Sequence, residues 1–218
     1  MLRTDRNFVF AYGSLLPRAD SGEETAVVCH LDGFRRGWNV AMDNAVTIPG
    51  YKYYVDVGTG ERPEIYVSFL NIWPAPGNRV NGVAYEVDEE ILPLLDLRER
   101  NYDRHEVTAG VDSGIPGRVW AYVGQAEARE RYEIGRARST AVVSERYCDS
   151  VRDEFSRSGP GMLREFDRTT DGLEVPRRAL RRIDLPDSGN GAHNGSDDSG
   201  PLRAWSRARP APRLPPAD

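Results

Sequence analysis

The chain has 218 residues, of which 39% are hydrophobic and 29% are charged, and its formal net charge at pH 7 is −5. A chain of this length holds one domain of ordinary size. The acidic balance argues against a general nucleic-acid-binding protein, which needs a surplus of cations to neutralise phosphates. No apolar run approaches the roughly 20 residues of a membrane span, and the N-terminus lacks the apolar stretch of a secretory signal. We therefore expect a soluble cytoplasmic protein with no nucleic-acid or membrane partner.

Cysteine and histidine are scarce. Cys29 and Cys148 are the two cysteines, so neither a disulfide scaffold nor a structural four-ligand zinc site is expected. His30 and His105 fall in predicted strands without an evident carboxylate or cysteine partner, and His193 falls in the C-terminal segment. The motifs of phosphate loops, dinucleotide-binding folds, zinc proteases and serine hydrolases are absent. We expect no metal and no cofactor.

Short apolar segments separated by glycine and proline predict strands along most of the chain. The predicted strands cover residues 7–12, 26–29, 37–42, 65–70, 80–87, 104–111 and 118–123. Two helices are also expected. One begins at the N-cap Asp88 and continues through Leu95; the other begins at Ser144 and ends at Gly159 and Pro160. This pattern predicts an α+β domain in which a few helices flank a mixed, curled sheet or a small barrel.

The composition changes after about residue 185. Residues 186–218 are rich in proline, glycine, serine and aspartate. Such a segment cannot bury enough apolar surface to offset the entropy lost on ordering. We expect a folded domain over residues 1–185 and a disordered tail over residues 186–218.

The residues after the first predicted strand form a candidate binding turn. Gly13 follows the strand directly and allows the backbone to turn sharply there. Successive N–H groups in such a turn can bind an anion or a developing oxyanion. An ordinary strand–loop junction has the same pattern, so the residues alone leave both interpretations open.

The first predicted helix ends with an acidic residue on its apolar face. At about 100° per residue, an apolar stripe is formed by Ile91, Leu92, Leu94 and Leu95. Glu99 lies four residues after Leu95 and projects from the same stripe. A carboxylate that faces inward is costly unless it is paired or protonated, and such a group suits acid/base chemistry. The alternative is a frayed helix end that leaves Glu99 solvated or paired with Arg104.

Three motifs, in this order, resemble those of the γ-glutamylcyclotransferase superfamily, including its ChaC-like and AIG2-like branches. They are FAYGSLL at residues 10–16, VNGVAYEV at 80–87 and LLDLRERNYDR at 94–104. The resemblance covers about residues 7–165. It implies a small γ-glutamyl substrate whose own α-amine attacks the δ-carbonyl, which releases 5-oxoproline and the attached amine. Because this ring closure is intramolecular, orientation supplies much of the rate and no cofactor is required.

The resemblance also implies roles for individual residues. Glu99 matches the single acid/base carboxylate of the family. Six residues match substrate-binding positions: Tyr12, Gly13, Ser14, Leu15, Tyr122 and Tyr147. Leu15 stands where the animal-type branch has asparagine, although ChaC-like and AIG2-like members also have leucine there.

Some alternatives stay open. Residues 45–78 form a longer segment than a minimal family member has, and either a substrate-selecting flap or a hairpin over a sheet edge would account for them. Hydrolysis of the γ-glutamyl amide by water is an alternative reaction. A small-ligand-binding protein without turnover is an alternative of another class. The sequence does not identify the amine attached to the γ-glutamyl group.

Overall fold

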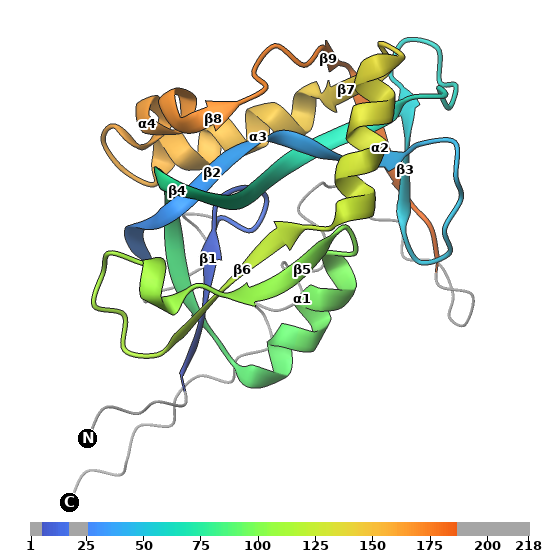
Figure 1. Cartoon of the computed structure of the whole chain (residues 1–218). Helices are drawn as coiled ribbons and strands as arrows, with labels where there is room; N and C mark the ends of the chain where they lie inside the picture. The colour runs from blue at the N-terminus through green and yellow to red at the C-terminus, as the bar shows by residue number, and fades with distance from the viewer. Residues whose placement is uncertain (1–5, 18–25, 187–218) are drawn as a thin grey trace, which may run out of the picture.

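The computed structural model describes residues 6–17 and 26–186 (Figure 1). Its strands are β1 Asn7–Ala11, β2 Val27–Asp43, β3 Lys52–Asp56, β4 Tyr66–Val87, β5 Tyr102–Glu106, β6 Arg118–Gly124, β7 Ala141–Ser144, β8 Thr170–Asp171, β9 Arg177–Arg178 and β10 Leu180–Asp184. The α-helices are α1 Leu92–Arg98, α2 Ala126–Ala137, α3 Glu145–Arg157 and α4 Met162–Thr169, and 3₁₀ turns occupy Glu89–Ile91 and Thr108–Gly110. The predicted tail lies, except for its first residue, outside the described residues.

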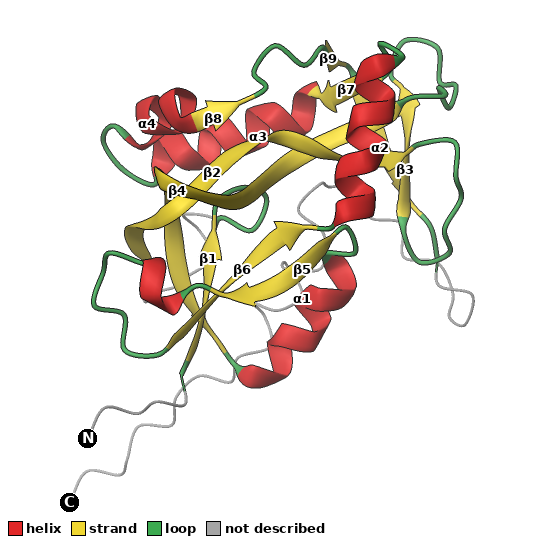
Figure 2. Ribbon diagram, in the orientation of Figure 1, coloured by secondary structure: helices red, strands yellow, loops and turns green. Residues whose placement is uncertain are grey.

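Most strands belong to one mixed sheet. Its order is β5-β6-β1-β4-β2-β8, with β7 also paired to β4. β1 is antiparallel to β4 and parallel to β6. Figure 2 shows the long strands β2 and β4 curving across the molecule. The α+β prediction is therefore confirmed, and the sheet is curled and open, with β5 and β8 at the ends of the path through the described residues. A separate two-stranded sheet joins β3 to β10.

The two longest strands were each predicted as two short ones. Apart from their first residues, the predicted strands 26–29 and 65–70 belong to β2 and β4, and the predicted strands 37–42 and 80–87 lie wholly within the same two strands. β2 and β4 pair from Val27 opposite Ala84 to Asp43 opposite Tyr66, with register shifts on either side of residues 34–37. Irregularities of this kind let a strand absorb glycines without ending. The glycines therefore mark bends in continuous strands, not the loops that were expected.

The helix prediction was incomplete. Asp88 and Ser144 occupy the expected N-cap positions, although neither side chain makes a capping hydrogen bond. The predicted strand 104–111 is shorter than expected, because β5 ends at Glu106 and a 3₁₀ turn follows. α2 and α4 were not predicted. Of the residues in α2, only Ala128, Tyr132 and Gly135 are buried, so its apolar stripe is too narrow to stand out.

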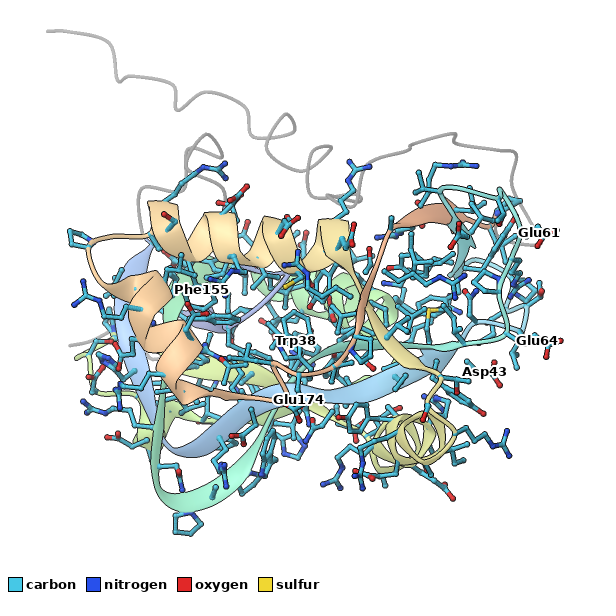
Figure 3. The ribbon with its side chains drawn as sticks, turned by 90° about the horizontal axis from the view of Figure 1, so that it is seen from above. Trp38, Asp43, Glu61, Glu64, Phe155 and Glu174 are labelled. Atoms are coloured by element: carbon cyan, nitrogen blue, oxygen red, sulfur yellow. The ribbon has the colours of Figure 1, made fainter. Side chains whose placement is uncertain are left out.

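A buried arginine joins the sheet to the helices that cover it. Arg36, on β2, is fully buried and donates hydrogen bonds to the backbone and side-chain oxygens of Asn81 and to the hydroxyl of Thr170. Its guanidinium lies 4.4 Å from the ring centroid of Phe166 on α4 and 5.0 Å from that of Phe155 on α3. Figure 3 labels Phe155 beside α3. Burial lowers the pKa of Arg36 to about 9. Arg36 therefore holds α3 and α4 over one face of the sheet. No helix in the described ranges is long and apolar enough to cross a membrane.

Candidate active site

The end of α1 directs Glu99 toward the interior. α1 ends at Arg98, and Glu99 is the C-cap residue, with φ −88° and ψ 48°. The N–H of Glu99 still donates to the Leu95 carbonyl, 2.8 Å away. The Glu99 side chain is 13% exposed, whereas that of Asp96 is 41% exposed. The inward direction follows the predicted stripe, although Leu94, which was placed on that stripe, is exposed.

Arg98 connects Glu99 to the turn after β1. Its Nε lies 3.2 Å from Oε1 of Glu99, and its Nη2 donates to the Ser14 carbonyl at 3.3 Å. Its Nη1 is buried and has no hydrogen-bond partner among the described residues. The alternative pairing of Glu99 with Arg104 is not observed, because Arg104 lies 3.2 Å from the carboxylate of Asp96. No local pattern predicts this role of Arg98, because its contact with Ser14 joins residues 84 positions apart.

The turn itself is closed by a hydrogen bond from the N–H of Leu16 to the carbonyl of Gly13, at 3.0 Å. Gly13 is not among the glycines with positive φ, so the turn does not need glycine for its backbone conformation, contrary to expectation. A β-carbon at residue 13 would instead lie 3.4 Å from Cδ1 of Leu70 and 3.6 Å from the hydroxyl oxygen of Tyr147. The absence of a side chain keeps the backbone open toward Tyr147.

Tyr147 comes from the first turns of α3. Its ring packs edge-on against Trp38, with centroids 5.6 Å apart, and against Phe69, with centroids 5.4 Å apart. Burial and the negative charge of Glu99 raise the pKa of Tyr147, and hydrogen bonds with the Leu70 backbone and with the Ser14 side chain act in the opposite direction. The phenol therefore keeps its proton at neutral pH and remains a hydrogen-bond donor.

Tyr12 and Tyr122 form a chain of hydrogen bonds beside this cluster. The Tyr12 hydroxyl donates to the Tyr122 carbonyl at 2.5 Å, and the Tyr122 hydroxyl donates to Oδ1 of Asp96 at 2.8 Å. Burial is the main cause that raises the pKa of both phenols; the hydrogen bond from its hydroxyl to Asp96 adds to the effect at Tyr122, and the charge of Glu99 adds to it at Tyr12. The Tyr122 hydroxyl thus holds α1 against β6. Leu15 is buried in the hydrophobic core.

Part of the long segment 45–78 contacts the residues after Glu99. Asn101 donates to the Tyr51 hydroxyl at 3.1 Å, and Arg100 donates to the Pro49 carbonyl at 3.4 Å. Burial, and then the charge of Glu99, raise the pKa of Tyr51 to about 12. Residues 66–78 belong to β4, so the segment that stands apart from the main sheet is shorter than the sequence indicated. These contacts were not predicted, because they join residues about 50 positions apart in the sequence.

The prediction that His30 lacks a carboxylate partner was wrong. Its Nδ1 lies 2.9 Å from Oδ2 of Asp112, and its Nε2 lies 3.1 Å from Oε2 of Glu165. These partners come from residues 82 and 135 positions away, which no local pattern reveals. Within residues 6–17 and 26–186, no group of three or more histidine, cysteine or acidic side chains is arranged to hold a metal ion.

Two surface cavities lie along α3, away from Glu99. One, of about 930 Å³, is lined by α3 residues that include Asp149 and by Leu180 of β10. The other, of about 700 Å³, lies where α3 leads into α4 and is lined in part by Arg157. Neither is lined by Glu99 or by residues 12–15. The candidate site is therefore defined by its polar contacts, and residues 18–25, which follow the turn, lie outside the described ranges.

A family model and several solved structures match this chain. A family model described as "Gamma-glutamyl cyclotransferase, AIG2-like" matches residues 9–141, which include the turn, Glu99 and Tyr122 but not Tyr147. No curated protein matches the chain. A solved structure described as a gamma-glutamyl cyclotransferase is 16% identical with a TM-score of 0.48, and the match covers 93% of this chain and 98% of that one.

Two further solved structures are similar to the chain. An uncharacterized protein from Homo sapiens is also 16% identical with a TM-score of 0.48, over 93% of this chain and 99% of that one. A yeast gamma-glutamyl cyclotransferase described as specific to glutathione is 16% identical with a TM-score of 0.37, over 55% of this chain and 69% of that one.

Proposed function

The chain belongs to the AIG2-like γ-glutamyl cyclotransferase family, and we propose that it is an enzyme that cyclises the γ-glutamyl group of a small molecule, releasing 5-oxoproline and the attached amine. The observation that carries the proposal is the arrangement of Glu99 and the turn after β1. A largely buried carboxylate and the turn contact the same guanidinium, that of Arg98. This arrangement supports Glu99 as the general acid/base and residues 12–15 as the substrate-binding turn.

In the proposed reaction, the substrate ammonium first releases a proton to the solvent to give a nucleophilic amine. As the amine nitrogen forms a bond to the δ-carbon, Glu99 accepts a second proton from it. Glu99 then donates that proton to the leaving nitrogen as the original amide C–N bond breaks. A single carboxylate near both nitrogens performs both transfers, and the reaction requires no water as a nucleophile.

The negative charge on the carbonyl oxygen needs fixed donors. The hydrogen bond from Leu16 to Gly13 closes the turn without using the N–H groups of Ser14 and Leu15, its central residues. Those two N–H groups are candidates to bind the oxyanion or the substrate carboxylate. The protonated hydroxyl of Tyr147, which faces Gly13, is a third candidate donor.

The test is product analysis with the wild-type protein. A panel of γ-glutamyl amino acids, γ-glutamylamines and glutathione is incubated with enzyme, and 5-oxoproline, glutamate and the free amine are quantified against enzyme-free controls. The proposal predicts equimolar 5-oxoproline and amine from at least one compound, without glutamate. Glutamate as the acyl product would support hydrolysis instead. No product from any compound, together with measurable binding, would support the non-catalytic alternative.

A further inference from the structure

Arg98 places a cation beside the proposed acid/base, and part of that cation has no protein partner. Nε faces Glu99 and Nη2 faces the Ser14 carbonyl. Nη1 is buried without a partner, and within the described ranges Arg98 is the arginine with such a nitrogen. A guanidinium carries five N–H donors, and a buried donor without an acceptor is unfavourable. Nη1 therefore marks a position where an acceptor, and above all an anion, would bind.

Other arginines near the site are already engaged. Arg131 donates to the Ala41 carbonyl and to Oδ1 of Asn101. Arg100 donates to the carbonyls of Leu97 and Pro49. Of these three guanidiniums, only that of Arg98 lies against both Glu99 and the turn. A substrate anion that binds between these two features therefore meets Arg98.

The ion pair of Arg98 and Glu99 matches the charges of the group that cyclises. A γ-glutamyl group carries an ammonium and a carboxylate on the same α-carbon. When the ammonium approaches Glu99, the carboxylate can approach Arg98, so that one ion pair within the protein is exchanged for two with the substrate. No charge is left buried without a partner during this exchange. The planar guanidinium also suits a carboxylate better than an ammonium would.

We propose, on the premise of the proposed function, that Arg98 binds the α-carboxylate of the γ-glutamyl group through Nη1 and thereby selects substrates in which a carboxylate lies beside the cyclising amine. Arg98 is then a specificity-determining residue, distinct from Glu99, which moves the proton. The substrate class is amides of γ-linked glutamate with a free α-carboxylate. Amides whose α-carboxylate is blocked or absent are rejected, even though they can close the same ring.

Two matched substrates test this role. A γ-glutamyl anilide cyclises to 5-oxoproline, whereas the 4-aminobutanoyl anilide lacks only the α-carboxylate and cyclises to 2-pyrrolidinone. Both release the same aniline. The wild-type protein is expected to favour the glutamyl compound by on the order of 100-fold in kcat/KM, because a site built around a polar contact rejects an analogue that lacks it. In Arg98→Gln, the ratio of the two kcat/KM values is expected to fall to within about threefold, because the cation that binds the carboxylate is absent.

The controls separate this role from a structural one. Arg98→Lys keeps the charge but loses the planar fork, and it is expected to retain an intermediate preference, on the order of tenfold. Arg152→Gln removes a guanidinium that pairs with Asp167 between α3 and α4, and it is expected to keep the full preference. A merely structural Arg98 would lower the turnover of both anilides equally and leave their ratio unchanged. That result in Arg98→Gln or Arg98→Lys overturns the proposal.

The outcomes also separate this inference from the proposed function. A wild-type protein that cyclises both anilides equally well contradicts the role of Arg98 but supports cyclisation. A wild-type protein that releases no aniline from either compound excludes anilides as substrates and leaves cyclisation to be decided by the panel of γ-glutamyl compounds. In that case calorimetric titration with the two anilides still tests Arg98: the glutamyl compound is expected to bind more tightly to wild type, and equal binding overturns the inference.

Discussion

The hydroxyl oxygen of Tyr147 lies 3.6 Å from the position that a β-carbon on Gly13 would occupy. The ring of Tyr147 is held by Trp38 and Phe69, so this hydroxyl faces the bare backbone of the turn. A residue of α3, in the second half of the chain, therefore lies against the turn that follows the first strand. Between them is the space that a β-carbon on residue 13 would fill.

Substituting Gly13 tests whether that space is used. In Gly13→Ala the new β-carbon would lie at ordinary contact distances, 3.4 Å from Cδ1 of Leu70 and 3.6 Å from the Tyr147 hydroxyl. The free energy of unfolding should change by less than about 1 kcal/mol, because the backbone needs no positive φ there. The kcat/KM for 5-oxoproline release should fall at least about tenfold, because the methyl group misplaces the reacting group.

A second glycine provides the contrasting variant. A β-carbon at Gly82 would lie 2.5 Å from the Ala11 carbonyl oxygen and 2.6 Å from Cζ of Phe10. Gly82→Ala should therefore lower the free energy of unfolding by about 1–3 kcal/mol, as overpacking does. Urea denaturation and steady-state kinetics on both variants distinguish a functional glycine from a structural one. Full activity in Gly13→Ala would count against the turn as part of the site.

Removing the Tyr147 hydroxyl tests its role as a donor. Tyr147→Phe keeps the ring contacts with Trp38 and Phe69, so the unfolding free energy should change by no more than about 1.5 kcal/mol. Loss of a donor to the developing oxyanion should lower kcat by about tenfold or more. Tyr132→Phe, on α2, is the matched control and should keep its turnover. Equal kcat values for Tyr147→Phe and the wild-type protein would remove Tyr147 from the mechanism.

The buried tyrosines predict a loss of stability at alkaline pH. Burial raises the pKa of Tyr12, Tyr51, Tyr102, Tyr122 and Tyr147, and that of Tyr51 reaches about 12 from an ordinary 10.0. The native state therefore keeps phenolic protons that the unfolded state releases near pH 10. The free energy of unfolding is therefore unaffected by these groups below about pH 10 and falls as the pH rises toward 12. Tyr51 alone is expected to lower it by on the order of 3 kcal/mol.

Urea denaturation between pH 8 and pH 11.5 measures this loss, and tyrosinate absorbance reports the titration directly. Tyr51→Phe cannot titrate at that position, so its unfolding free energy should decline less steeply above pH 10. A folded protein in which all tyrosines ionise with a midpoint near pH 10 would contradict the burial of these hydroxyls.

Arg36 should be essential for stability. Arg36→Met leaves the oxygens of Asn81 and the hydroxyl of Thr170 buried without their donor. The expected loss of unfolding free energy is about 3 kcal/mol or more, by analogy with breaking a buried charged network. Arg35→Met removes the neighbouring guanidinium, which is 48% exposed and pairs with Asp171, and should cost less than about 1 kcal/mol. Similar urea midpoints for the two variants would contradict this account of the α3–α4 layer.

Local sequence patterns predicted the helices and strands that have distinct boundaries in the sequence. They missed or divided the elements whose conformation depends on contacts with distant parts of the chain. β1, β6 and α3 follow distinct apolar runs and were predicted closely. β2 and β4 were each predicted as two strands, because Gly33 and Pro74 are residue types typical of loops. In the structure, Gly33 lies at a register shift within β2 and Pro74 lies within β4. α2 was missed because its buried face is narrow. The error in β2 and β4 arises because pairing with a strand distant in the sequence decides their local conformation.

In the candidate site, too, local features were predicted and long-range contacts were not. The spacing from Leu95 predicted that Glu99 faces inward, because helical periodicity is a local property. The contact of Arg98 with Ser14 and the flanking of His30 by Asp112 and Glu165 depend on long-range folding. No pattern within the sequence alone reveals such pairs. The motif resemblance predicted that the turn and Glu99 belong to one site, and in the structure Arg98 contacts both Glu99 and the Ser14 carbonyl.

Glu99→Gln tests the central claim most directly, because the amide has nearly the same shape but cannot carry the proton. 5-Oxoproline release is measured for this variant and for Glu133→Gln, which changes an exposed residue on α2 that pairs with Arg136. We predict that Glu99→Gln unfolds at the same urea concentration as the wild-type protein but releases 5-oxoproline about 10³-fold more slowly, while Glu133→Gln is unaffected. Release by Glu99→Gln at the wild-type rate would contradict the assignment of Glu99 as the acid/base.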